Sequence, residues 1–296
     1  MTVSVRLAIV AITTSLGTPT PPSHDLEFTF KTRQPIVQVS VNGGTSVPFV
    51  VDTGATIHLV DEEIARQARV AGTSDLRMHG GGQAGVQAHI AESLTMKVGD
   101  LTWSEQRAAI VPLGYPKRKH FAGLLGAQIL KQYTVRFNFS GCTMSLLDPG
   151  GYKPPTGAAL VPFELDEDLP IVHVTLDAGS GPLDARLMVD TGAAAFIELN
   201  RPFVDAHNLL AAIADARPDD RPAALGGTAP FLYGTARHVV FGGVTFDRPR
   251  IGLSRATSGS SSRSERDGIL GNDLLRNWLV DVDYSRRTLV LVPPGE

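Results

Sequence analysis

Two copies of the tetrapeptide Asp-Thr-Gly-Ala occur in the chain, at residues 52–55 and 190–193. Each copy ends an apolar run, and each is followed by a second signature, Gly-Leu-Leu-Gly at 123–126 and Gly-Ile-Leu-Gly at 268–271. One Asp-Thr-Gly is an ordinary turn sequence, but two copies in the same context suggest half-sites that become complete when they meet. Two carboxyl groups brought together could perform acid–base hydrolysis.

The duplication extends beyond these motifs. Residues 123–149 align without a gap with residues 268–294, and the apolar and aromatic positions coincide. Upstream, the segments 35–39 and 170–174 both alternate apolar and polar residues, which is the period of a half-buried strand. A repeat of this length is too long for a solenoid, whose units span about 20–50 residues. The sequence therefore predicts two tandem lobes of one fold.

We expect the N-terminal lobe to cover residues 23–150 and the C-terminal lobe residues 151–296, joined by a Pro/Gly-rich connection at 148–156 with little to bury. Each lobe is predicted to contain strands, short helices, a glycine-rich hairpin and its own closing strand pair. The expected elements are a helix from Glu62 to about Val70 capped by Asp61, a short helix capped by Asn200, short helices at 127–131 and 272–277, glycine-rich hairpins at 77–87 and 225–234, turns at Gly99-Asp100 and Gly242-Gly243, and a flexible serine-rich loop at 257–264.

Composition narrows the class of protein. Of 296 residues, 43% are hydrophobic and 19% charged, with a net charge of −3, which predicts a packed rather than a disordered chain. The one basic run, at 117–120, is interpreted as a solvated loop, so we expect no nucleic-acid partner. A single cysteine, Cys142, allows no intramolecular disulfide, and the eight scattered histidines contain no His-Glu-x-x-His pair. We therefore expect no metal site.

The N-terminus has the pattern of a targeting segment. Arg6 precedes an apolar stretch at 7–12, and Ser15 and Gly17 would suit a cleavage site before a Pro-rich spacer. We expect residues 1–22 to be a signal segment and linker, and the protein to be periplasmic or secreted; a cytosolic tail or first strand is the alternative, with a cytoplasmic location. The stretch is shorter than the roughly 20 apolar residues of a membrane-spanning helix, and no other segment qualifies.

With these motifs the chain resembles the aspartic peptidases with paired Asp-Thr-Gly motifs, over about residues 27 to 294. More narrowly, it is similar to a single-chain, two-repeat member of the retropepsin-like group. Both motifs continue with alanine, Ala55 and Ala193, as in retroviral-type peptidases, whereas pepsin-type enzymes usually carry Ser or Thr there. The resemblance implies an all-β, bilobal, closed-barrel fold with pseudo-twofold symmetry and a few short helices. It also places an active site between the lobes, under one or two hairpin flaps.

The resemblance implies catalysis by Asp52 and Asp190. Two carboxyl groups about 3 Å apart cannot both ionise comfortably, so the pair shares a proton and acts on one water between them. Near-symmetry leaves open which carboxyl is the base and which the acid. Ala55 and Ala193 offer no hydroxyl to either carboxyl, so we expect a dyad less tuned to strong acid than that of pepsins.

The neighbours of the dyad have implied supporting roles. Thr53 and Thr191 would bond across to the opposite loop, while Gly54 and Gly192 would let the backbone aim N–H groups at the carboxyls. The flap and substrate-binding candidates are His79, Gly80, Gly81, Gly82, Phe231 and Tyr233.

We therefore expect an aspartic endopeptidase that acts on peptides or proteins as a monomer, without a metal or cofactor. The alternative is a retropepsin-like module that binds or assembles peptides and whose dyad is weak or silent; the presence of both aspartates favours the enzyme. The run Gly80–Gly85 formally satisfies the dinucleotide-binding fingerprint. The residues after it read as strands rather than a crossover helix, which disfavours a nucleotide or phosphate binder.

Overall fold

The computed structural model describes residues 23–117, 119–219 and 225–293. The predicted targeting segment, residues 1–22, lies outside the described residues. Strands dominate and the helices are short, so the all-β prediction is confirmed. Within the described part of the chain, no helix has the length and apolar character needed to cross a membrane.

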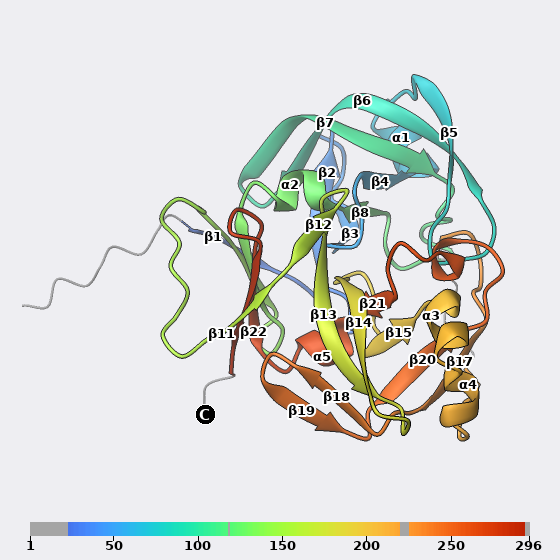
Figure 1. Cartoon of the computed structure of the whole chain (residues 1–296). Helices are drawn as coiled ribbons and strands as arrows, with labels where there is room; N and C mark the ends of the chain where they lie inside the picture. The colour runs from blue at the N-terminus through green and yellow to red at the C-terminus, as the bar shows by residue number, and fades with distance from the viewer. Residues whose placement is uncertain (1–22, 118, 220–224, 294–296) are drawn as a thin grey trace, which may run out of the picture.

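The first repeat forms a seven-stranded sheet, at the top of Figure 1, in the order β2-β3-β8-β4-β7-β6-β5. Its strands are β2 (Ile36–Val41), β3 (Val47–Val51), β4 (His58–Asp61), β5 (Ser74–Met78), β6 (Val86–Val98), β7 (Leu101–Val111) and β8 (Gly123–Leu125). Strand β3 runs parallel to β8, and β4 pairs antiparallel with the other side of β8. The first Asp-Thr-Gly loop leaves the end of β3 and therefore lies beside the Gly-Leu-Leu-Gly segment.

The second repeat forms a ten-stranded sheet, at the bottom of Figure 1, in the order β16-β17-β20-β15-β21-β14-β13-β18-β19, with β12 paired to β13. Its strands are β12 (Glu164–Asp166), β13 (Leu169–Asp177), β14 (Pro182–Val189), β15 (Ile197–Leu199), β16 (Arg217–Pro218), β17 (Phe231–Thr235), β18 (His238–Phe241), β19 (Val244–Asp247), β20 (Arg250–Ser254) and β21 (Gly268–Leu270). The order β14-β21-β15-β20-β17-β16 reproduces β3-β8-β4-β7-β6-β5 strand for strand. The duplication read from the sequence is thus a duplication of topology.

A third sheet joins the two repeats, at the left of Figure 1, in the order β1-β10-β9-β22-β23-β11. Its strands are β1 (Ser23–Glu27), β9 (Thr134–Asn138), β10 (Thr143–Leu147), β11 (Ala159–Pro162), β22 (Leu279–Asp283) and β23 (Thr288–Val292). Each repeat supplies the expected closing strand pair, β9–β10 and β22–β23, and the two pairs are joined because β9 pairs directly with β22. At the centre of this pairing Arg136 lies opposite Asp281 and donates to its buried carboxylate over 2.6 and 2.7 Å.

The helices begin at the expected residues. Helix α1 (Glu62–Gln67) is capped by Asp61, whose carboxylate accepts the Glu63 N–H at 3.1 Å, and it ends before Val70. The other helices are α2 (Ala127–Leu130), α3 (Arg201–Ala206), α4 (Leu209–Ala212), α5 (Asn272–Leu275) and the 3-10 turn η1 (Ser260–Ser262). Asn200 precedes α3, but its side chain does not cap the helix; it donates instead to the carbonyls of Arg263 and Arg266.

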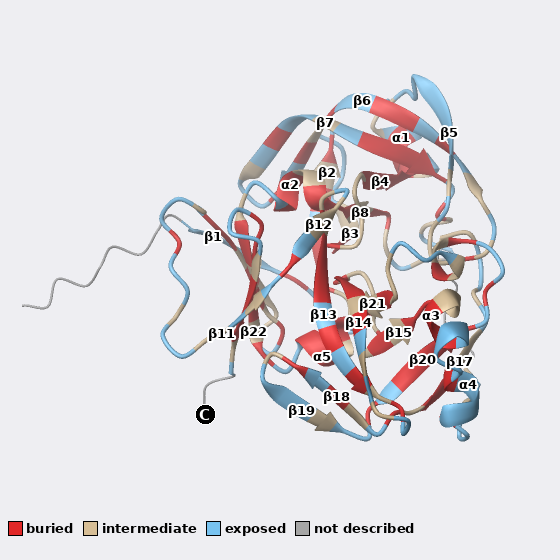
Figure 2. Cartoon of the chain, in the orientation of Figure 1, coloured by how far each residue is buried: buried red, intermediate tan, exposed pale blue. Residues whose placement is uncertain are grey.

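The buried residues form one main hydrophobic cluster that runs through both repeats, as the red segments of Figure 2 indicate. Its largest fully buried side chains come from all three sheets and include Phe49, Phe137, Leu187 and Ile197. Smaller apolar clusters cover other faces of the sheets. The two repeats therefore share one continuous interior.

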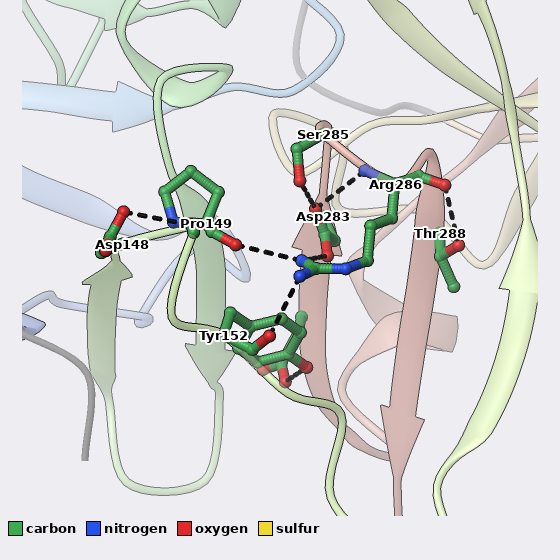
Figure 3. A network of polar contacts seen from close by, with 9 residues as sticks. Asp148, Pro149, Tyr152, Asp283, Ser285, Arg286 and Thr288 are labelled. Carbon is green, nitrogen blue, oxygen red and sulfur yellow. Dashed lines mark hydrogen bonds and ion pairs between the residues drawn. The ribbon is translucent and has the colours of Figure 1, made fainter. Parts of the chain in front are cut away.

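The connection between β10 and β11 is anchored, contrary to the expectation of a segment with little to bury. Tyr152 is only 3% exposed, and its hydroxyl donates to Asp281. The guanidinium of Arg286 donates to the carbonyls of Pro149 at 3.1 Å and Tyr152 at 3.2 Å, and to Asp283 at 2.8 Å (Figure 3). This connection is fastened to the sheet that both repeats share.

Candidate active site

The two aspartates of the repeated motif lie at equivalent places in the two sheets. Asp52 follows β3, and its N–H donates to the carbonyl of Leu125 at 2.9 Å. Asp190 follows β14, and its N–H donates to the carbonyl of Leu270, also at 2.9 Å. Each Gly-Leu/Ile-Leu-Gly segment therefore supports one aspartate loop, and each carboxyl group lies against the glycine of the opposite loop.

The two threonines interlock the loops. The Thr53 N–H donates to Thr191 Oγ1 and the Thr191 N–H donates to Thr53 Oγ1, both at 3.0 Å. Each hydroxyl in turn donates to the opposite strand, Thr53 to Val189 O at 2.6 Å and Thr191 to Val51 O at 2.8 Å. Both side chains are fully buried. Four reciprocal bonds without competing water hold the loops in one relative position.

The two glycines are required because each packs against the opposite carboxyl group. A Cβ atom on Gly54 would lie 2.8 Å from the Cγ atom of Asp190, and one on Gly192 would lie 2.6 Å from the Cγ atom of Asp52. Any side chain at either position would push the two carboxyl groups apart. The approach of the aspartates thus depends on glycine at both positions.

Desolvation favours the protonated forms of the two carboxyl groups. Desolvation raises the pKa of both Asp52 and Asp190, and the negative charge of Asp52 raises the pKa of Asp190 further. The Gly54 N–H donates to Asp52 Oδ1 at 2.8 Å, whereas Asp190 Oδ1 is buried without a hydrogen-bond partner among the described residues. Backbone donation stabilises the ionised form. The arrangement favours an ionised Asp52 beside a protonated Asp190.

A buried histidine supports the first loop, and the sequence patterns did not single it out. His58 in β4 is fully buried, and its Nδ1 accepts the Gly126 N–H at 2.9 Å while Nε2 faces Gln106 Oε1 at 3.3 Å. These partners require a neutral ring with the proton on Nε2. Burial lowers the pKa of His58 to about 4. The available signal was its place in a fully apolar stretch directly after the first motif.

Two amides support the second loop and were also missed. Asn272, at the start of α5, donates through Nδ2 to Thr191 O at 2.7 Å and to Arg33 O at 2.8 Å. Gln34 donates through Nε2 to Gly192 O at 2.6 Å. Asn272 aligns with Ala127 of the first repeat, so comparing the repeats could have drawn attention to it. No sequence pattern marks Gln34, because it contacts Gly192 O only when the fold brings the second Asp-Thr-Gly loop beside it.

The predicted flap is the hairpin between β5 and β6, and its tip, residues 79–85, contacts the second repeat. The Gly82 N–H donates to Leu225 O at 2.8 Å, and the Ala84 N–H donates to Gly226 O at 2.9 Å. A Cβ atom on Gly80 would lie 2.6 Å from the Cβ atom of Leu225. Gly81 lies between these contacts, and His79 is exposed at the base of the tip. The glycine run thus permits a close backbone crossing between the repeats.

The serine-rich loop at 257–264 fastens the same tip. The Ser258 hydroxyl donates to Gln83 O at 2.8 Å, the Thr257 N–H donates to Gln83 Oε1 at 3.1 Å, and the Ser260 hydroxyl donates to Gly80 O at 3.1 Å. This loop was expected to be a flexible insertion. It instead contains η1, and together with residues 225–228 it holds the flap tip by hydrogen bonds; we call this set of contacts the clasp.

Phe231 and Tyr233 lie in β17, in the sheet rather than at a second hairpin tip. Strand β17 pairs with β16 on one side and with β20 on the other, so the segment 225–234 contributes one strand of the sheet and not the predicted hairpin. Tyr233 is buried and its hydroxyl donates to Glu198. Of the predicted segment, residues 225–228 are the ones that contact the flap tip.

The sheet faces beside the dyad differ between the repeats. Paired residues of neighbouring strands share a face, and a Cβ atom on Gly54 would lie 2.9 Å from Met188 Cε, which places the Met188 face at the site. The matching rows are Val50, Leu124, Leu59, Ala109 and Ile90 in the first repeat and Met188, Ile269, Glu198, Gly252 and Tyr233 in the second. The row of the first repeat is entirely apolar, whereas the row of the second repeat contains the hydrogen-bonded pair Glu198 and Tyr233.

Among the residues that the structure describes, no group of three or more histidine, cysteine, aspartate or glutamate side chains is arranged to hold a metal ion.

Comparisons with known proteins agree with this geometry. Residues 37–129 match the family model described as aspartyl protease. The fold is similar to the crystal structure of aspartic proteinase from Irpex lacteus, with a TM-score of 0.61 and 14% sequence identity over 93% of this chain and 98% of that one. A search of curated proteins finds no match. The aspartyl protease family model thus covers the first Asp-Thr-Gly loop, and the chain shares the fold of an aspartic proteinase. Both findings support a pepsin/retropepsin-like aspartic peptidase.

Proposed function

We propose that the protein is an aspartic endopeptidase in which Asp52 and Asp190 act together on one water. The observation that carries this proposal is that each carboxyl group packs against the glycine of the opposite loop, in a geometry held by the interlocked threonines. A pair that shares one proton has a base and an acid in the same place, which is what hydrolysis of an amide requires.

In the proposed reaction Asp52 takes a proton from the water as its oxygen attacks the peptide carbonyl carbon. Asp190 gives its proton to the carbonyl oxygen, so a neutral tetrahedral intermediate forms and Asp190 becomes ionised. When the C–N bond breaks, the leaving nitrogen takes the proton from Asp52, and a hydroxyl of the intermediate returns a proton to Asp190. The products are a carboxylic acid and an amine, and the dyad regains its starting state.

The surroundings of the dyad support a peptide as the substrate. The apolar row from Val50 to Ile90 offers a surface for a hydrophobic side chain on one side of the scissile bond. The flap tip bridges the two repeats by backbone hydrogen bonds and would help exclude water around an extended chain. We further propose that one chain supplies the complete site, so that the monomer is active. From the predicted targeting segment we propose a periplasmic or secreted location.

The test is cleavage of a denatured protein mixture, with the new termini identified by mass spectrometry. Wild type should produce termini with a shared sequence preference, whereas Asp52→Asn and Asp190→Asn should produce almost none. Asp75→Asn is the matched control, because its side chain is 71% exposed and lies outside the dyad. If wild type and both dyad variants give the same termini, the proposed chemistry is wrong. If wild type binds the denatured chains without cutting them, the alternative of a binding module holds.

A further inference from the structure

The peptide unit between Thr191 and Gly192 connects the dyad to a buried amide behind it. Its N–H belongs to Gly192, which packs against the Asp52 carboxyl group, since a Cβ atom there would lie 2.6 Å from Asp52 Cγ. Interaction with the Gly192 backbone lowers the pKa of both aspartates. Its carbonyl, on Thr191, accepts the Asn272 Nδ2–H at 2.7 Å. The carbonyl of this peptide therefore accepts a side-chain amide, while its N–H end lies beside the proposed catalytic carboxyl groups.

Asn272 is fixed in this orientation. Its side chain is fully buried, and its two N–H groups point at two carbonyls, those of Thr191 and Arg33. A flipped amide would place an oxygen against both carbonyls, so the assignment of the nitrogen is determined by the partners. The next carbonyl along the loop, that of Gly192, accepts Gln34 Nε2–H at 2.6 Å. Two consecutive carbonyls of the second loop therefore receive side-chain amides.

The first loop has a different support. The residue that aligns with Asn272 is Ala127, which begins α2 as Asn272 begins α5. Support there comes from His58, which binds the Gly126 N–H rather than a carbonyl of the loop. The internal repeat therefore shows that a helix begins at this place without an asparagine. A structural need of the helix alone does not explain Asn272.

We propose that Asn272 and Gln34 are positioning residues that hold and polarise the backbone of the second Asp-Thr-Gly loop, so that the Gly192 N–H donates strongly to the shared-proton dyad. Hydrogen bonds in series strengthen one another in a buried, low-dielectric setting. A donor on the Thr191 carbonyl makes the N–H of the same peptide a better donor. A better donor favours the ionised state of the dyad, in which one carboxyl must be charged for catalysis.

This inference rests on the proposed function for its kinetic consequences. The other groups that act on the dyad are Arg266, whose positive charge lowers the pKa of Asp190, and the buried Tyr284 hydroxyl. The Arg33–Asp273 ion pair, at 2.5 Å, borders Asn272. Replacing Asn272 also removes the hydrogen bond to the Arg33 carbonyl, whereas replacing Gln34 does not, so a change in the dyad's titration that both variants share can be attributed to the lost loop donors.

The test compares Asn272→Ala and Gln34→Leu with wild type. Losing one buried hydrogen bond that acts in the transition state should lower kcat about five- to tenfold and leave KM within about twofold. The acidic limb of the pH–rate profile should move to higher pH, because the ionised dyad is stabilised less. Asn272→Ala recreates the residue of the first repeat, and Gln34→Leu serves as a second variant if that protein folds poorly.

Asn277→Ala is the matched control. Asn277 follows the same helix, and its amide donates to Leu274 O at 2.6 Å without touching the loop. It should leave both kcat and the acidic limb unchanged, even where it lowers the melting temperature. A control that shifts the acidic limb as far as Asn272→Ala does would show that the effect is only structural.

A readout that does not need proteolysis separates this inference from the proposed function. Carbon-13 NMR titration of the aspartate side chains, assigned with Asp52→Asn and Asp190→Asn, follows the dyad directly. Both amide variants should raise the lower apparent pKa of the dyad relative to wild type. Unchanged titration and unchanged kcat in both would overturn the inference. If no form of the protein cleaves peptides, the proposed function fails, while the titration still decides the role of the two amides.

Discussion

Acidification should destabilise the fold through His58. Its folded-state pKa of about 4 lies below the ordinary value of 6.5, because burial disfavours the charged ring. Between these two values the unfolded chain binds a proton that the folded chain does not bind. Stability from this group is therefore complete above pH 6.5, falls as the pH drops to 4, and changes little below. The difference of 2.5 pKa units corresponds to about 3 kcal/mol, a large share of the roughly 5–15 kcal/mol of a typical domain.

The dyad acts in the opposite direction. Burial raises the pKa of Asp52 and of Asp190, so the folded protein binds protons more tightly than the unfolded chain does. The carboxyl groups therefore destabilise the fold at neutral pH, and this cost disappears as the pH falls toward their ordinary value. The two effects oppose each other between about pH 4 and 6. The stability of wild type alone is consequently a poor measure of either group.

The assay is urea unfolding of wild type and His58→Asn at half-unit steps from pH 4 to pH 7.5. Asparagine retains an oxygen near the Nδ1 position to accept the Gly126 N–H, but it does not titrate. The dyad contributes equally to both proteins, so the difference in unfolding free energy isolates His58. It should shrink by about 3 kcal/mol from pH 7 to pH 4 and be constant above pH 7.

His79→Asn, which removes an exposed imidazole, controls for the general loss of a histidine. A wild-type-minus-His58→Asn difference that is the same at pH 4 and pH 7 would refute the reasoning, because His58 could not then be a buried neutral acceptor. A difference that grows on acidification would mean that the folded protein stabilises the imidazolium.

Further outcomes follow from the geometry of the dyad and flap. The double variant Asp52→Asn/Asp190→Asn should be hardly less active than either single variant, since the carboxyls act as one unit; additive losses of activity would contradict this. Specific activity should not change on dilution, because one chain carries both half-sites; a second-order loss would indicate dimerisation. The pH–rate profile should be bell-shaped with a mildly acidic optimum, about pH 4–6, and Ala193→Ser should move its acidic limb downward if the hydroxyl reaches the carboxyl. Gly82→Val should lower kcat/KM and expose the flap-tip amides to hydrogen exchange, because a Cβ atom there would meet Gly226 and Gly227; protection equal to wild type would show that the clasp is not closed in solution.

Features encoded by neighbouring residues could be predicted from the sequence. Asp61 caps α1 because the acceptor and the N–H that it binds are two residues apart. Gly99-Asp100 and Gly242-Gly243 form the turns of β6–β7 and β18–β19 because each turn needs only its own residues. The approach of the two Asp-Thr-Gly loops could also be predicted, because the motif occurs twice in the sequence.

Features that depend on distant partners could not be predicted in the same way. Asn200 has the local pattern of a cap, but two carbonyls more than sixty residues away compete successfully for its amide. Tyr152 lies in a segment rich in proline and glycine, and only Asp281, far along the chain, explains why it is buried. His58 and Gln34 likewise acquire their roles from backbone groups that the fold brings to them. Periodicity and spacing contain no information about such pairings.

The ion pair at the centre of the shared sheet bears on how the halves recognise each other. Arg136 and Asp281 are equivalent residues of the two repeats, and they lie directly opposite one another in β9 and β22. An assembly of two first halves would place arginine against arginine there, and one of two second halves would bury aspartate against aspartate. Only unlike halves bring opposite charges together at this point. Separately produced halves, when mixed, should therefore sort into unlike pairs, and a chain that acquired this difference could no longer return to a symmetric dimer by losing either half.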